Sequence, residues 1–89
     1  MRRSLQERLD WIMRSGNLTV ADLSRLLDRP YPTVRGWATG TALGGAAMDA
    51  ALVMAQIEKL ERRIRDREQF PVPRMSPGKR VEYVDKIRL

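Results

Sequence analysis

The hydrophobic residues of this chain recur every three or four positions over most of its length, a pattern that predicts an all-α fold. The first predicted helix covers residues 5–14. Ser4 and Glu7 have the spacing of a capping box and would begin this helix. Its apolar stripe consists of Leu5, Leu9 and Ile12.

A second helix is predicted to follow after a short connection. Thr19 and Asp22 have the same capping-box spacing and would begin it. Asp28 lies where this helix should end, because aspartate tolerates the left-handed backbone conformation of a tight turn. The residues that share one face of this helix are Val20, Leu23, Ser24 and Leu27.

Two prolines separate the second helix from a third. Pro30 and Pro32 lack the backbone N–H that a helix interior needs, but proline is accepted in the first turn of a helix. A new helix is therefore predicted over residues 31–39, and Gly40 is suited to end it. Its buried face consists of Val34 and Trp37, with Thr33 and Ala38 at the edges.

The segment from Leu18 to Gly40 resembles, without a gap, the helix-turn-helix of phage-repressor (Cro-like) DNA-binding proteins. In that family the second helix of the unit lies in the major groove and contacts base edges from its N-terminal end. The resemblance therefore implies a small helix-turn-helix core that binds duplex DNA. The residues that carry it are Leu23, Ser24, Leu27, Val34 and Trp37.

The resemblance also implies which residues contact DNA. Tyr31, Pro32 and Gly36 match the base-contacting positions of the family, and Thr33 and Arg35 lie beside them. Proline and glycine have no side-chain hydrogen bond to offer a base edge, so base discrimination would be weak or supplied partly by DNA shape. The candidate DNA-contacting residues are Thr19, Arg25, Arg29, Tyr31, Pro32, Thr33, Arg35, Gly36 and Thr39.

Three family features are missing from this segment. Asp28 replaces the usual turn glycine, Val20 replaces a glutamine at the start of the first helix, and Pro32 and Gly36 replace polar side chains. The alternative interpretation is a helical hairpin that packs a small domain or docks against another protein.

A loop over residues 40–45 leads into a predicted fourth helix over residues 46–69, which would be about 36 Å long at about 1.5 Å per residue. Its apolar positions narrow to a coiled-coil spacing, and such a helix is longer than the small core could cover. We therefore expect self-association into a dimer or higher oligomer, although the helix end could also be solvated or fold back on its own chain. The predicted oligomerisation residues are Val53, Ile57, Leu60 and Ile64.

The last part of the chain is predicted to be a proline-rich linker, residues 70–78, followed by a basic tail. Alternating apolar residues at Val81 and Tyr83 favour a short β-strand there. This strand would pair with another protomer or another protein, or the tail would be disordered. The chain thus divides into a DNA-binding domain (1–57), a long helix whose distal part oligomerises (46–69), and a linker with its tail (70–89).

The formal net charge is +6, which suits a polyanionic partner such as DNA. The chain contains no histidine and no cysteine, so the common proton shuttle, thiol nucleophile and zinc ligands are absent. We expect no catalysis, no cofactor and no metal. The sequence contains neither a signal peptide nor an apolar run that could span a membrane, and the expected location is the cytoplasm of a bacterial or phage-infected cell.

Two functional classes fit these features. The first is an oligomeric transcription regulator, a repressor of the phage type, that presents the helix over residues 31–39 to DNA half-sites. The second is a DNA-packaging adaptor, because the order of parts resembles the small terminase subunits of tailed phages. Those proteins combine an N-terminal helix-turn-helix, a helical oligomerisation region and a C-terminal β segment.

Overall fold

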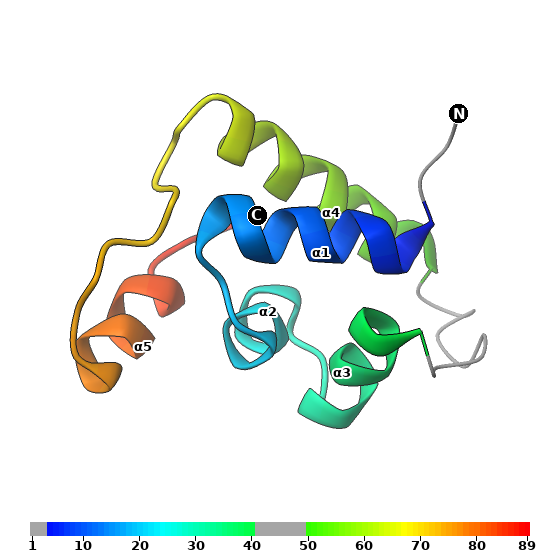
Figure 1. Cartoon of the computed structure of the whole chain (residues 1–89), viewed down its shortest axis with the longest axis horizontal. Helices are drawn as coiled ribbons and strands as arrows, with labels where there is room; N and C mark the ends of the chain where they lie inside the picture. Colours follow the sequence, from blue (N-terminus) through cyan, green and yellow to red (C-terminus); the bar gives the residue numbers. More distant parts are fainter. Residues whose placement is uncertain (1–3, 41–49) are drawn as a thin grey trace.

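The described part of the chain, residues 4–40 and 50–89 of a computed structural model, forms five α-helices and contains no β-strand (Figure 1). Helix α1 packs against both α3 and α4, and α2 packs against α3 and against α5. The prediction of an all-α fold is confirmed for this part of the chain. The helices are α1 (Leu5–Gly16), α2 (Val20–Leu27), α3 (Tyr31–Thr39), α4 (Ala50–Arg65) and α5 (Pro77–Asp85).

Two capping boxes fix where α1 and α2 begin. The Ser4 hydroxyl accepts a hydrogen bond from the Glu7 N–H at 3.1 Å, and the Glu7 carboxylate accepts one from the Ser4 N–H at 3.2 Å. Thr19 and Asp22 repeat this arrangement at 3.1 and 2.8 Å. Both predicted helix starts are confirmed. Helix α1 extends to Gly16, slightly further than predicted.

Gly16 brings three segments of the chain together. A Cβ atom at this position would lie 3.0 Å from side-chain carbons of both Ile64 and Leu18, so a larger residue would require these two side chains to shift. The Gly16 carbonyl accepts a hydrogen bond from the Val72 N–H at 2.8 Å. The Asn17 amide in turn donates to the Val72 carbonyl at 2.7 Å. The segment after α4 is therefore fastened to the end of α1.

All five helices contribute to one hydrophobic core. Its members also include two residues from the segment between α4 and α5, so the C-terminal third of the chain is part of the same packed unit. The buried core residues are Leu9, Ile12, Leu18, Leu23, Leu26, Leu27, Val34, Trp37, Val53, Ile57, Leu60, Ile64, Phe70, Val72, Val84 and Ile87.

Helix α4 is shorter than predicted at its C-terminal end and is covered by its own chain. It ends at Arg65 instead of Gln69, because the backbone turns through positive φ angles at Arg67 (57°) and Gln69 (67°). The predicted start of this helix at residues 46–49, and residues 41–45 of the predicted loop, lie outside the described residues.

The predicted oligomerisation stripe does not form a surface. Val53, Ile57, Leu60 and Ile64 are each 0–7% exposed and belong to the core of a single copy. Their coiled-coil spacing suits packing against α1 as well as it would suit a second chain, because any adjacent helix can pack on the same stripe. The alternative, that the helix folds back on its own chain, describes this structure.

The proline-rich segment is held in place along the core and is not a free linker. Phe70 and Val72 are 3% and 2% exposed. The Tyr83 hydroxyl of α5 donates a hydrogen bond to the Gln69 carbonyl at 2.5 Å. These contacts fasten the beginning of the segment. Residues 70–76 form no helix, as expected of an extended linker, whereas residues 77 and 78 of the predicted linker belong to α5.

The predicted C-terminal strand is wrong as well, because residues 77–85 form α5. Ser76 occupies the N-cap position and Pro77 the first turn, both favourable places for these residues. Val84 is buried, and Val81 and Tyr83 are partly buried. Their local alternation suggested a strand, whereas packing of α5 against α2 selects the helix.

An ion pair joins α1 to α4. The Arg8 guanidinium donates two hydrogen bonds to the Glu61 carboxylate, at 2.5 and 3.1 Å. Both side chains are largely buried, at 18% and 12% exposed. The hydrogen bond to Glu61 raises the pKa of Arg8 above its ordinary value, although burial opposes this.

A second ion pair fastens α5 to the beginning of α2. The Nε and Nη2 atoms of Arg80 donate to one oxygen of the Asp22 carboxylate at 2.9 and 2.7 Å, and Nη2 also donates to the Asn17 carbonyl. Burial by itself would raise the pKa of Asp22, but the hydrogen bonds from Arg80 and Thr19 outweigh it and lower the pKa. Asp22 therefore serves as the third helical residue of the α2 capping box and as the anchor of α5.

The burial of the α4 stripe predicts the effect of truncating it. We expect Leu60→Ala, which empties a fully buried site, to lower the free energy of unfolding by about 2–5 kcal/mol. The matched control on the same helix is Leu52→Ala, because Leu52 is 56% exposed and its truncation should change stability by less than about 0.5 kcal/mol. Urea unfolding measures both. Equal stability of the two variants, with loss of a larger assembly only for Leu60→Ala, would show that the stripe joins subunits instead.

The Asp22–Arg80 pair predicts a pH dependence of stability. Because the Asp22 pKa is lower in the folded chain than its unfolded value of about 3.9, its contribution is fully present above that value and is lost as the pH falls through the folded value. Asp22→Asn should lower the free energy of unfolding at neutral pH by about 1–3 kcal/mol. The difference from the wild type should shrink in acid.

Urea unfolding of Asp22→Asn over a pH series tests this prediction. Asp10→Asn is the control, because the Asp10–Arg14 pair is exposed and its loss should change stability by less than about 1 kcal/mol. A difference between Asp22→Asn and the wild type that stayed constant into strong acid would contradict the assignment.

Candidate functional site

The connection between α2 and α3 is a tight turn that is stabilised without glycine. Asp28 adopts the left-handed conformation expected of it, with φ at 53°. The Ser24 hydroxyl donates a hydrogen bond to the Arg29 carbonyl at 2.7 Å, and the Arg29 N–H donates to the Ser24 carbonyl at 3.1 Å. Ser24, which the sequence places on the apolar face of the second helix, thus fixes the turn that sets the relative orientation of α2 and α3.

Helix α3 is oriented by its buried face. Val34 is fully buried and Trp37 is 7% exposed, so the opposite side of the helix faces solvent. The helix begins where the N–H groups of Thr33 and Val34 donate to the Pro30 carbonyl, at 3.1 and 3.2 Å. It ends at Gly40, whose φ of 76° is unfavourable for other residues and confirms the predicted end.

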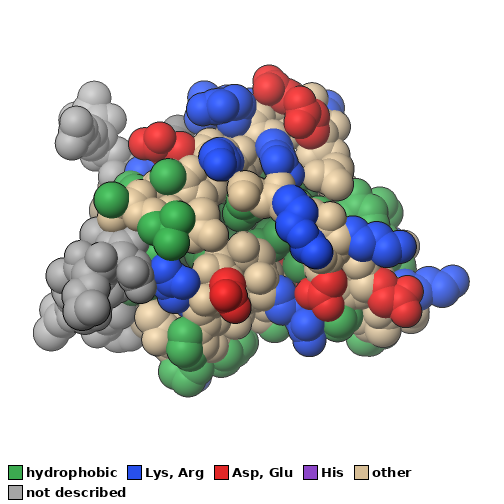
Figure 2. Space-filling view, turned by 180° about the vertical axis from the view of Figure 1, so that it is seen from behind, with side chains coloured by type: hydrophobic (Ala, Val, Ile, Leu, Met, Phe, Trp, Pro, Cys, Tyr) green, Lys and Arg blue, Asp and Glu red, His purple; other side chains and the backbone are tan. Residues whose placement is uncertain are grey.

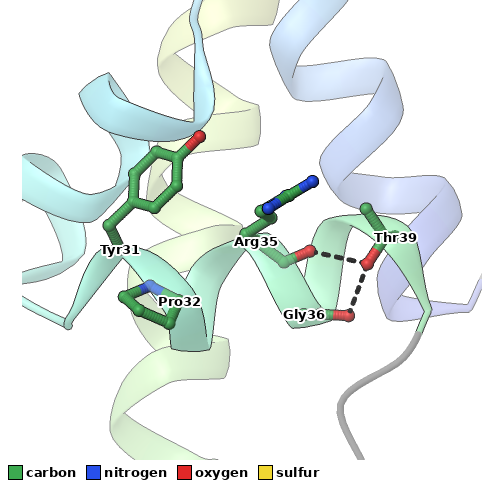
Figure 3. Close-up of a pocket in the computed structure, with 5 residues that line it drawn as sticks. All are labelled: Tyr31, Pro32, Arg35, Gly36 and Thr39. Atoms are coloured by element: carbon green, nitrogen blue, oxygen red, sulfur yellow. Dashed lines mark hydrogen bonds between the residues drawn. The ribbon is translucent and has the colours of Figure 1, made fainter.

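Five of the predicted DNA-contacting residues lie together on the solvent side of α3. They line an open hollow along the helix, and Figure 3 shows them following one another in helical order. Tyr31 is 48% exposed, a large exposed area for an aromatic residue. The five residues are Tyr31, Pro32, Arg35, Gly36 and Thr39.

Few hydrogen-bonding side chains are available on this face. The Thr39 hydroxyl donates to the Arg35 carbonyl at 2.9 Å and lies 3.5 Å from the Gly36 carbonyl (Figure 3). Among these five residues, the Tyr31 hydroxyl and the Arg35 guanidinium remain as the side-chain groups that could bind a base edge. No acidic side chain of residues 4–40 or 50–89 forms an ion pair with Arg35.

The other four candidates lie outside the hollow. Thr33 is partly buried at the edge of α3, and Thr19 is the N-cap of α2, with its hydroxyl bound to a backbone N–H. Arg25 is paired with Asp85 of α5 at 3.3 Å, and both side chains are about half exposed. The Arg29 guanidinium folds back on the end of α2 and donates to a backbone carbonyl there at 3.0 Å.

Basic side chains are also present away from α3. Figure 2, which views the molecule from behind, shows Lys and Arg interspersed with Asp and Glu over that face. The excess positive charge of the chain therefore does not form a field of one sign on this side.

The contribution of α5 to this region is missing from the sequence prediction. Arg80 and Asp85 place α5 against α2 through pairs with Asp22 and Arg25. The local signal for α5 is the Ser76–Pro77 pair, which favours a helix start. Nothing in the sequence pattern identifies the partners of Arg80 and Asp85, because they are about sixty residues distant.

Two further properties of the described residues concern metal ions and membranes. No group of three or more Asp, Glu, His or Cys side chains in this part of the chain is arranged to hold a metal ion. None of its helices has the length and apolar character needed to cross a membrane.

Comparison of the chain with models of protein families finds no match, and neither do comparisons with curated proteins and with solved structures.

Proposed function

We propose that this protein binds duplex DNA by placing α3 in the major groove, and that it acts as a transcription regulator of the phage-repressor type in the cytoplasm of a bacterial or phage-infected cell. The observation that carries the proposal is the exposed face of α3. The five residues of that face include the three that match base-contacting positions in the helix-turn-helix family. The opposite face is held in the core by Val34 and Trp37, so α3 can enter a groove as a rigid element.

Charge around α3 supports the same proposal. Arg25, Arg29 and Arg35 all belong to the α2–turn–α3 unit, within a chain of net charge +6. The Arg25–Asp85 pair is half exposed, and such pairs contribute only about 0.2–1 kcal/mol. A DNA phosphate could therefore replace the Asp85 carboxylate at low cost, and phosphate contacts would supply most of the affinity.

A DNA-packaging adaptor is the second candidate. It is favoured by one observation: the α3 face offers only the Tyr31 hydroxyl and the Arg35 guanidinium for hydrogen bonds to bases. Weak base discrimination suits a protein that binds DNA without strict sequence choice. The order of parts in this structure resembles that of an adaptor less closely than the sequence suggested. The residues expected to join subunits are buried in the core, and the segment expected to form a β-strand is α5.

The proposal predicts that Arg35 contributes to DNA affinity. We expect Arg35→Ala to weaken binding of a labelled duplex and, if the guanidinium contacts phosphate, to reduce the slope of log affinity against log salt by about 1. The matched control is Arg65→Ala, which removes the same charge from the exposed end of α4. Titrations between about 50 and about 200 mM salt measure both. Equal affinities and equal slopes for the two variants would contradict the role of α3.

A regulator and an adaptor should differ in their specificity for DNA sequence. A regulator should bind the DNA upstream of its own gene about a thousandfold more tightly than unrelated DNA of equal length. Competition of the two duplexes for the full chain measures this ratio. A ratio near one would overturn the regulator and favour the adaptor.

A further inference from the structure

We infer that the α3 face recognises thymine bases through their 5-methyl groups. This inference rests on the proposed function and specifies what α3 detects in the groove. In the major groove, thymine differs from cytosine by its methyl group as well as by its hydrogen-bonding atom. A face with few polar side chains can detect the methyl group by apolar contact alone.

The groups that this face presents to solvent are mainly apolar. Tyr31 exposes about half of its surface, and Pro32 is exposed beside it. Gly36 adds only its Cα atom, so the DNA could approach the helix backbone closely at that point. Apolar side chains of this kind are the ones that contact thymine methyl groups in protein–DNA complexes.

Thr39 contributes its methyl group, because its hydroxyl is directed at the helix. The hydroxyl donates to the Arg35 carbonyl at 2.9 Å. Figure 3 shows the oxygen turned toward the carbonyls and the methyl carbon on the other side. A residue that is polar by sequence therefore presents an apolar surface at this position.

The helical register arranges these groups as a strip. Tyr31, Arg35 and Thr39 follow at intervals of four residues, and Pro32 and Gly36 form the adjacent row. At about 1.5 Å per residue the strip is about 12 Å long, which corresponds to three or four base-pair steps of about 3.4 Å. Apolar contacts at both ends of the strip place more than one thymine within reach.

The test compares duplexes that differ only in methyl groups. One pair is an A·T duplex with thymine and the same duplex with every thymine replaced by uracil. The other pair is a G·C duplex with cytosine or with 5-methylcytosine. We expect uracil to weaken binding of the full chain about fourfold for each contacted thymine, the factor for burying about one methyl group. The 5-methylcytosine duplex should bind more tightly than its unmodified counterpart.

Three variants separate direct contact from altered DNA stiffness. Tyr31→Phe keeps the ring and should keep the thymine-to-uracil ratio, whereas Tyr31→Ala should reduce it. Both changes are at an exposed position, so the fold should be retained. Leu52→Ala, at an exposed site on α4, is the control and should leave the ratio unchanged.

The outcomes distinguish the inference from the proposed function. Thymine preference that falls in Tyr31→Ala and persists in Tyr31→Phe supports the inference. Equal binding of the thymine and uracil duplexes, or a preference that Tyr31→Ala leaves intact, overturns it while the proposed function stands. Failure to bind any of the duplexes at low salt overturns both.

Discussion

Burial of the apolar stripe of α4 is the constraint on which the rest of the structure depends. The stripe is buried in the core, and α1 packs against α4. Gly16 permits this arrangement, because its missing side chain lets α1 approach Ile64 closely. The Arg8–Glu61 pair then fixes the α1–α4 contact at a second point. A single copy of the chain therefore completes its own core among the described residues.

The same core determines what α3 can do. Helix α3 is anchored on α1 and α2 by Val34 and Trp37, and the short turn at Asp28 fixes its direction. Its solvent face is left with a tyrosine, a proline, a glycine, an arginine and a threonine whose hydroxyl is bound to the helix. Such a face combines one positive charge with apolar groups. We base both the proposed DNA binding and the inferred thymine contact on the composition of this face and on its exposure to solvent.

Local signals predicted helices α1, α2 and α3 because the determinants of these helices are local. Ser4 with Glu7, Thr19 with Asp22, and Asp28 each act within one turn of the chain, and each behaves as predicted. The partner of the α4 stripe could not be predicted, since its spacing fits a helix of the same chain or of another copy. Helix α5 was missed because its contacts, such as Arg80 with Asp22, join residues far apart in sequence. In the candidate site, the sequence predicted the five DNA-contacting residues that lie together on α3. It did not predict the partners of Arg25 and Arg29.

We propose that α3 is the surface that meets DNA. Backbone amide chemical shifts of the isotope-labelled full chain, followed during titration with a duplex, test this most directly. We expect the largest changes at residues 31–40 of α3 and its C-cap, smaller changes at the start of α2, and little change along α4. Changes confined to α4 and α5, with the α3 amides unmoved at saturating duplex, would contradict it.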